Sequence, residues 1–208
     1  MIVASCYYGN LSPDVINAQK HVLMTMVMNT DIGYVHYKTH DHATGMTELT
    51  RSLSKSHPDE SILWLDVDCI PTDKASLALA NNGKFHGCAQ RANHIENDKH
   101  IYVSPFMMHL PLSVYRDMGE PSFSATYRGD VGEELTYLYA ELVAKGKYKP
   151  AVMAMPTECV DPMWDLFDGS GFGIGTTYTN GFYHNFCIRE PRMAQLFIDK
   201  CAQVCSTK

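Results

Sequence analysis

A chain of 208 residues is long enough to bury the core of one domain without disulfide or metal cross-links, so a single domain over residues 1–208 is expected. Its 45% hydrophobic and 19% charged residues are typical of a globular protein and exclude a disordered, collagen-like or coiled-coil chain. A formal net charge of -6 argues against nucleic-acid partners, which need a basic surface to bind phosphates.

No apolar stretch reaches the roughly 20 residues of a membrane-spanning helix, and residues 1–10 lack the charged leader of a signal peptide. The seven cysteines are odd in number and lie mostly among apolar residues, which favours buried free thiols over disulfides. A cytoplasmic protein without a membrane span is therefore expected.

The first part of the chain predicts alternating strands and helices. Residues 2–7 form a short apolar run that predicts a strand, and the Ser-Pro-Asp sequence after it predicts the start of a helix over residues 13–28. A strand at 33–37 and a helix at 43–56 follow. Residues 61–65 predict a third strand, and its continuously apolar residues 62–65 are typical of a central parallel strand covered on both faces.

The later part of the chain changes character. Residues 162–179 are rich in glycine and aromatic residues, and their run 169–175 is expected to be a loop that closes over substrates or merely connects elements. The element order predicts an α/β fold with an open, mainly parallel sheet flanked by helices and with ligands at the carboxyl ends of its strands. The other expected elements are helices at 73–80, 111–118, 132–145 and 190–205, and strands at 85–90, 101–108 and 151–155.

Two acids, Asp66 and Asp68, directly follow the apolar run at 61–65. Because side chains two residues apart on an extended backbone point to the same side, both carboxylates are expected to share one divalent cation. Such a cation also binds diphosphate oxygens and stabilises the charge that grows on a leaving nucleoside diphosphate. The alternative is that the two aspartates only cap the turn and the next helix.

The run LWLDVDCIP at residues 63–71 resembles the D-x-D motif of the GT-A glycosyltransferases, together with the acidic segment 132–134 and the late Tyr183-His184-Asn185. The resemblance extends to the layout of nearly the whole chain, and compact virus-encoded sugar transferases are the members nearest in size. It implies a GT-A-like domain that moves a hexose from a nucleoside-diphosphate sugar, by family frequency a UDP-sugar, to a hydroxyl of a glycan or glycoprotein acceptor.

The resemblance also implies the residues that bind the metal and the donor. In many members a late histidine completes the metal site, here His184, and an imidazole ligand shifts preference from Mg²⁺ toward Mn²⁺; packing among aromatic residues is the alternative for this side chain. The nucleoside is expected at the end of the first strand, where a tyrosine can stack on the base. The implied nucleoside-binding residues are Ser5, Cys6, Tyr7 and Tyr8, with packing in the core as the alternative for either tyrosine. Arg91, after the fourth expected strand, is a candidate for the diphosphate or the sugar, with a surface charge as its alternative, and Asp66 is shared between the metal and the nucleotide.

Three acids, Asp130, Glu133 and Glu134, are candidates for the group that meets the acceptor. An inverting transfer needs a carboxylate that removes the proton of the attacking hydroxyl, and the family's acceptor-side acid commonly occupies a comparable segment. Glu133 or Glu134 is preferred, since Asp130 is better placed as the cap of the helix that follows. The alternative is that all three only interact with the helix dipole.

Other functions compete with this interpretation. A sugar nucleotidyltransferase shares the strand-first architecture but normally has a glycine-rich, basic loop in place of residues 6–10. Three histidines and an aspartate in residues 36–42 suggest a zinc hydrolase, but they lack the His-Glu-x-x-His arrangement and are expected to line the donor pocket as a loop. A non-catalytic carbohydrate-binding or virion structural protein would not need paired acids.

Overall fold

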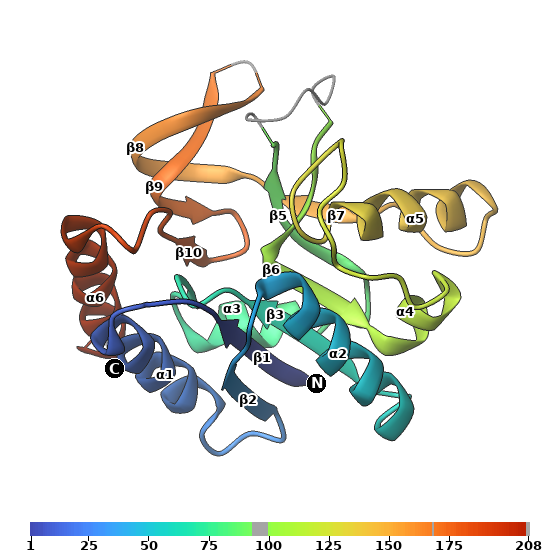
Figure 1. Cartoon of the computed structure of the whole chain (residues 1–208), viewed down its shortest axis with the longest axis horizontal. Helices are drawn as coiled ribbons and strands as arrows, with labels where there is room; N and C mark the ends of the chain where they lie inside the picture. Colours follow the sequence, from blue (N-terminus) through green and yellow to red (C-terminus); the bar gives the residue numbers. More distant parts are fainter. Residues whose placement is uncertain (93–99, 168, 207–208) are drawn as a thin grey trace.

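The computed structural model describes residues 1–92, 100–167 and 169–206, which form two β-sheets and the helices around them (Figure 1). The helices are α1 (Pro13–Val27), α2 (His42–Ser56), α3 (Lys74–Ala80), α4 (Leu112–Asp117), α5 (Glu133–Ala144) and α6 (Pro191–Ser206). The strands are β1 (Ile2–Tyr7), β2 (Gly33–Lys38), β3 (Ser61–Leu65), β4 (Cys69–Pro71), β5 (His86–Gln90), β6 (Tyr102–Pro111), β7 (Val152–Ala154), β8 (Pro156–Phe167), β9 (Ser170–Tyr178) and β10 (Phe182–His184). No helix in these described ranges has the length and apolar character needed to cross a bilayer.

The larger sheet has the strand order β2-β1-β3-β6-β5-β7. β1 pairs in parallel with β2 and β3, and β5 pairs in parallel with β7. β6 runs antiparallel to both of its neighbours, β3 and β5. The predicted α/β fold with an open, mainly parallel sheet flanked by helices is therefore confirmed, with β6 as the exception.

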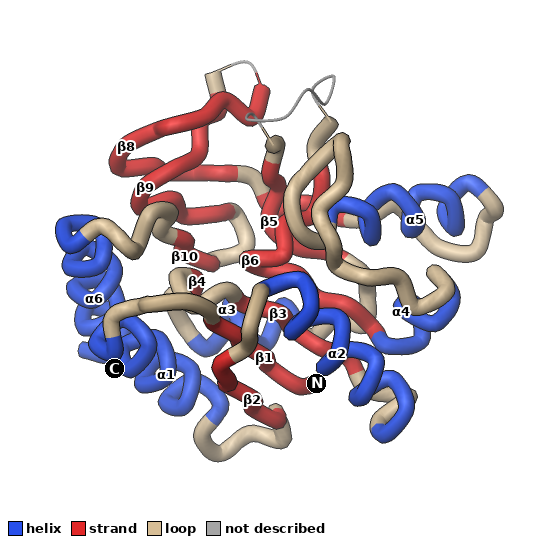
Figure 2. The backbone as a smooth tube through the Cα atoms, in the orientation of Figure 1, coloured by secondary structure: helices blue, strands red, loops and turns tan. Residues whose placement is uncertain are grey.

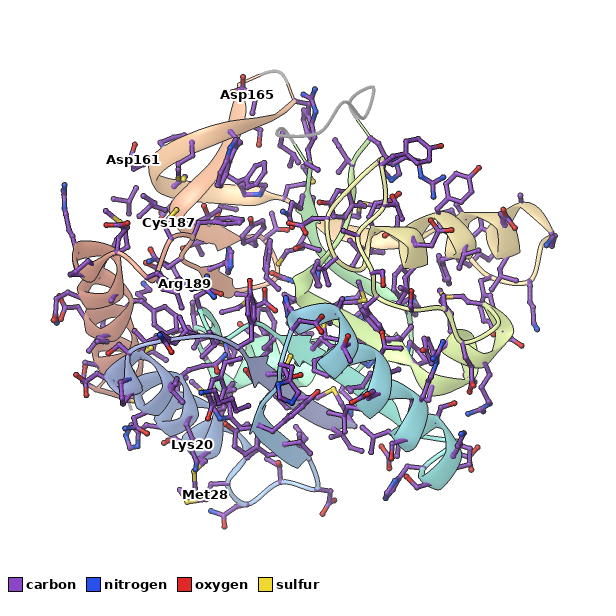
Figure 3. All side chains as sticks on the ribbon, viewed as in Figure 1. Lys20, Met28, Asp161, Asp165, Cys187 and Arg189 are labelled. Carbon is purple, nitrogen blue, oxygen red and sulfur yellow. The ribbon has the colours of Figure 1, made fainter. Side chains whose placement is uncertain are left out.

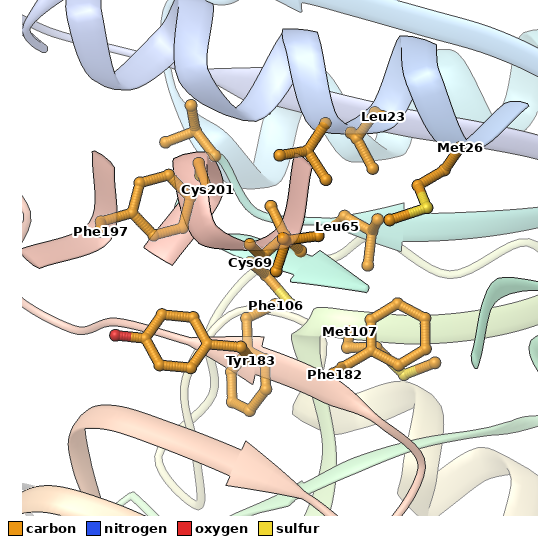
Figure 4. Close-up of a cluster of buried hydrophobic side chains, with 14 of the residues drawn as sticks. Leu23, Met26, Leu65, Cys69, Phe106, Met107, Phe182, Tyr183, Phe197 and Cys201 are labelled. Carbon is orange, nitrogen blue, oxygen red and sulfur yellow. The ribbon is translucent and has the colours of Figure 1, made fainter. Parts of the chain in front are cut away.

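Side chains of β3 alternate between two hydrophobic clusters, one on each face of the sheet. Leu63 and Leu65 pack on the side of α1 and α6, which lie next to each other (Figures 1 and 4). Ile62 and Trp64 pack on the opposite side with residues of α2, α4 and α5. The Trp64 indole also donates a hydrogen bond to Thr50 Oγ1 at 3.2 Å. Burial on both faces explains why residues 62–65 of this strand are apolar without interruption.

The smaller sheet is antiparallel, in the order β4-β10-β9-β8, and lies beside the larger one (Figure 2). The prediction of a loop at residues 169–175 is wrong, because most of this run belongs to β9. β9 forms a bulged hairpin with β8. A Cβ on Gly173 would lie 2.6 Å from both Asp161 O and Met163 N of β8. The glycines therefore permit close pairing of two strands rather than loop motion.

The two sheets meet where the chain leaves β3. β4 follows β3 after a short turn and pairs with β10, so that His184 lies opposite Cys69 although 115 positions separate them in the sequence. The carboxyl ends of β1 and β3 share one edge of the larger sheet, since these strands are parallel neighbours. The fold thus brings β1, β3 and the late strand β10 together at that edge.

All seven cysteines are free, but only Cys6, Cys69, Cys88 and Cys201 are buried as expected; Cys159 and Cys205 are half-buried and Cys187 is exposed. Polar burial is more unusual at His86 and His109, whose stacked rings have centroids 4.9 Å apart on β5 and β6. Each ring has one hydrogen bond to a carbonyl: His86 Nε2 to Ala80 O at 2.9 Å, and His109 Nδ1 to Lys84 O at 2.6 Å. Burial lowers the pKa of both imidazoles, that of His109 to about 4.

This pair predicts an acid-sensitive fold. The unfolded chain binds a proton at each histidine near pH 6.5, before the folded protein does, so the free energy of unfolding should be level above that pH and fall toward pH 4. His109 alone accounts for a loss approaching about 3 kcal/mol at pH 4. His109→Gln keeps an amide donor for Lys84 O but does not titrate. Urea unfolding at pH 7 and 5 should show a smaller loss for His109→Gln than for wild type; equal losses would contradict this role.

Candidate functional site

Asp66 and Asp68 lie on a tight turn between β3 and β4. Cys69 N donates to Asp66 O at 2.9 Å and closes the turn, and Asp66 N donates to Phe106 O of β6 at 3.0 Å. The prediction that the backbone stays extended through Asp68 is therefore wrong. The carboxylates lie close together because the chain turns between them.

Three possible metal ligands converge at this turn. One ligand atom from each of Asp66, Asp68 and His184 lies within 4.8 Å of the other two, and His184 Nε2 is 3.1 Å from Asp68 Oδ1. Two atoms that bind one ion at right angles, each at about 2.2 Å, are about 3 Å apart. Two carboxylates and an imidazole with this spacing fit a divalent cation, and the group can bind one.

The His184 ring is fixed by two aromatic side chains. It stacks on Phe106, with centroids 4.0 Å apart and an interplanar angle of 6°, and it meets Phe186 edge-on at 4.1 Å. Asn185 N donates to Asp68 O at 3.0 Å and joins the end of β10 to the turn. The packing that was expected as the alternative for His184 is therefore present, and it leaves Nε2 in position to bind a metal ion. Packing holds Nε2 toward Asp68.

A buried glutamine, Gln19 of α1, braces the turn from behind. Its Nε2 donates to Asp66 O and, at 2.9 Å, to Cys69 O, the carbonyls at the two ends of the turn. Its Oε1 accepts from Ser5 Oγ at 2.9 Å and lies 3.2 Å from His36 Nε2. Gln19 was not predicted from the sequence, although its position four residues after Val15 and four before Leu23 places it on the buried stripe of the helix.

Ser5 lies behind the site, because its hydroxyl is committed to Gln19. His36 has the same function in the network: burial, and to a lesser degree the charge of Lys20, lowers its pKa to about 4. A neutral His36 ring that donates from Nε2 to Gln19 Oε1 completes the network. Ser5 was expected to contact the nucleoside; it does not line the cavity described next.

A cavity of about 220 Å³ opens above the turn. Its walls come from β1, the β3–β4 turn, β5, β6, the loop before α5, and β10 with the segment after it. It joins seven residues expected to form a site: Cys6, Tyr7, Tyr8, Asp66, Asp68, Asp130 and His184. The remaining described lining residues are Leu11, His42, Val67, Gln90, Ser104, Pro105, Phe106, Val131, Phe186, Ile188 and Arg189.

His42 was expected to belong to a loop, but it is the first residue of α2. Its side chain faces the turn. Its Nε2 lies 2.8 Å from Asp66 Oδ1, and its ring stacks on Tyr8 with centroids 6.0 Å apart. Burial by itself lowers the pKa of His42, but the negative charge of Asp66 and hydrogen bonds to Asp66 and Cys6 raise it well above the usual value. His42 therefore offsets part of the negative charge of the aspartate pair.

Arg189 supplies a permanent positive charge beside Tyr8. It lies between β10 and α6, where Figure 3 labels it, and its guanidinium carbon is 4.9 Å from the centre of the Tyr8 ring. It is the only lysine or arginine among the described residues that line the cavity. Arg91, the arginine chosen from the sequence, is not among them. No local motif marks Arg189, because the fold alone brings it to Tyr8.

Of the three acids proposed for the acceptor side, Asp130 lines the cavity and the two glutamates do not. Glu133 is buried, accepts from Thr126 Oγ1 at 2.7 Å and lies 2.8 Å from His100 Nε2. Glu134 pairs with Arg128. The expected helix cap is wrong as well: Gly132, with φ 79°, precedes α5, and Asp130 Oδ1 accepts from Val131 N instead. Of the three acids, Asp130 is therefore the one that lines the cavity.

No protein-family model matches the sequence, and no curated protein matches it. Among solved structures, the crystal structure of A197 from STIV is similar at 10% sequence identity and a TM-score of 0.42, over 66% of this chain and 77% of that chain. The functional assignment consequently rests on the residues of the cavity.

Proposed function

We propose that the chain is a metal-dependent glycosyltransferase of the GT-A type, which moves a hexose from a nucleoside-diphosphate sugar, preferentially a UDP-sugar, to an acceptor hydroxyl. One observation carries the proposal: the possible metal ligands Asp66, Asp68 and His184 share a cavity with the cation Arg189. This combination suits a diphosphate bound together with a divalent ion.

The residues present fit a divalent cation by number, type and spacing. Asp68 and His184 would hold it, with Asp66 as the third ligand, and the imidazole favours Mn²⁺ over Mg²⁺. When bound, the ion neutralises negative charge on the leaving nucleoside diphosphate. His42 keeps Asp66 oriented by its hydrogen bond at 2.8 Å.

Arg189 and Tyr8 define the nucleotide end of the cavity. Arg189 carries its charge at every physiological pH and can donate two hydrogen bonds to phosphate oxygens. Tyr8 is 39% exposed, lies at the end of β1 and offers a ring on which a base can stack. Since the two side chains touch, the base and the diphosphate would bind next to each other.

Asp130 is assigned to the acceptor, a glycan or glycoprotein hydroxyl. Its carboxylate lies on the segment before α5 and lines the cavity, whereas Glu133 and Glu134 are tied to His100, Thr126 and Arg128. A carboxylate within hydrogen-bond reach of the hydroxyl accepts its proton as the glycosidic bond breaks. Glu133 instead holds the Thr126 side of this segment in place.

The metal assignment predicts that Asp68→Asn loses Mn²⁺-dependent binding of UDP. Second-shell changes commonly cost 10–100-fold in metal affinity, so removal of an anionic ligand should weaken binding by about 100-fold or more. Isothermal titration of UDP with and without Mn²⁺ measures this directly. Asp161→Asn, at an exposed acid of β8, is the matched control and should behave as wild type. Equal Mn²⁺-dependent affinity in Asp68→Asn and wild type would refute the assignment.

The Arg189 assignment predicts a loss that depends on the phosphates. Arg189→Gln should bind UDP in the presence of Mn²⁺ about 10-fold more weakly than wild type, because one charge-assisted contact is lost. Affinity for uridine, which has no phosphate, should stay the same. The exposed Arg192→Gln, on α6, is the control. If Arg189→Gln retains wild-type affinity for UDP, the diphosphate lies elsewhere.

A further inference from the structure

The cavity follows the strand order of the larger sheet from β1 to β5. Cys6, Tyr7 and Tyr8 lie at the β1 end, Asp66 and Asp68 after β3, Ser104 to Phe106 on β6, and Gln90 at the end of β5. Neighbouring strands are about 4.8 Å apart, so the three steps from β1 to β5 span about 14 Å. The cavity is therefore an elongated site with two chemically different ends.

If the proposed function is right, the β5 end of the cavity receives the sugar of the donor. Tyr8 and Arg189 lie at the β1 end, and the possible metal ligands lie after β3. A donor whose base and diphosphate occupy those positions directs its transferred group toward β6 and β5. That part of the wall is formed by Gln90, Ser104, Pro105, Asp130 and Val131.

Gln90 is held in one orientation at this end. It is 8% exposed, and its Oε1 accepts from Ser104 Oγ, which itself accepts from Phe106 N at 3.3 Å. The amide group Nε2 of Gln90 makes no hydrogen bond to any residue that the structure describes. Because the oxygen is committed to Ser104, the two N–H groups are what Gln90 offers to a ligand.

The charges at this end select against an anionic sugar. Asp130 is the charged side chain among the described residues that form this wall, and Arg189, the arginine of the cavity, lies toward Tyr8. A sugar carboxylate would meet Asp130, and none of the described residues of this wall is a lysine or arginine that could compensate for its charge. A hydroxyl can accept from Gln90 Nε2 and donate to Asp130.

We propose that Gln90 is a specificity-determining residue that donates a hydrogen bond to a hydroxyl of the donor sugar, and that the site takes a neutral hexose in preference to a uronic acid. Ser104 is the positioning residue that fixes the Gln90 amide. The sugar and the base would contact different residues, because Gln90 and Tyr8 lie at opposite ends of the cavity.

Isothermal titration in the presence of Mn²⁺ tests this inference with four ligands: UDP, UDP-glucose, UDP-galactose and UDP-glucuronate. Wild type should bind at least one UDP-hexose about 10-fold more tightly than UDP-glucuronate. Gln90→Leu removes the donor groups with little change in volume and should weaken binding of that hexose donor about 5- to 10-fold while UDP affinity stays the same. Gln90→Glu replaces the donor with an acceptor and should weaken it further.

Gln195→Leu, on the exposed side of α6, is the control and should bind all four ligands as wild type does. Unchanged UDP affinity in the Gln90 variants also reports that they fold. The inference is overturned if Gln90→Leu and Gln90→Glu bind the hexose donors as wild type does, or if wild type binds UDP-glucuronate as tightly as UDP-hexoses. Failure of wild type to bind UDP in a Mn²⁺-dependent way overturns the proposed function itself.

Discussion

The side chain of Gln19 holds the turn on which the whole site depends. Its two N–H bonds are donated to Asp66 O and Cys69 O, and its oxygen lies within hydrogen-bond distance of Ser5 and His36. A buried amide that satisfies every donor and acceptor stabilises one geometry, whereas a partly satisfied one would be costly. The turn is thereby tied to α1, β1 and β2 at once. The backbone that carries the two carboxylates is thus fixed from behind.

The second constraint is the pairing of β10 with β4. β4 begins directly after the turn, so its partner strand must deliver His184 beside Asp68. Phe106 and Phe186 then fix the ring, and the segment that continues from β10 brings Arg189 to Tyr8. The charged side chains of the cavity thus come from distant parts of the chain. His42, close to Asp66, reduces the repulsion between the two aspartates.

Much of the fold follows from local sequence signals. The apolar run at 61–65 and the Ser12-Pro13 start of α1 are visible because they reflect burial and capping within a few residues. The prediction of a loop at residues 169–175 was wrong because glycine is common both in loops and in closely paired strands. The partner strand β8, which distinguishes the two structures, cannot be identified from this run alone. Gln19 and Arg189 were missed because their partners are backbone or ring atoms far away in the sequence. The prediction that Asp130 caps the following helix was wrong because Gly132 is the residue that directly precedes α5.

The divalent ion is the part of the proposed site that can be located most directly. A crystal of the protein grown or soaked with Mn²⁺ and UDP, measured near the manganese absorption edge, locates that ion without reference to activity. We expect an anomalous peak within about 2.0–2.4 Å of an Asp68 oxygen and of His184 Nε2, with the UDP diphosphate on its open side and the base toward Tyr8. An ordered UDP with no manganese at these residues, or manganese bound elsewhere, would contradict it.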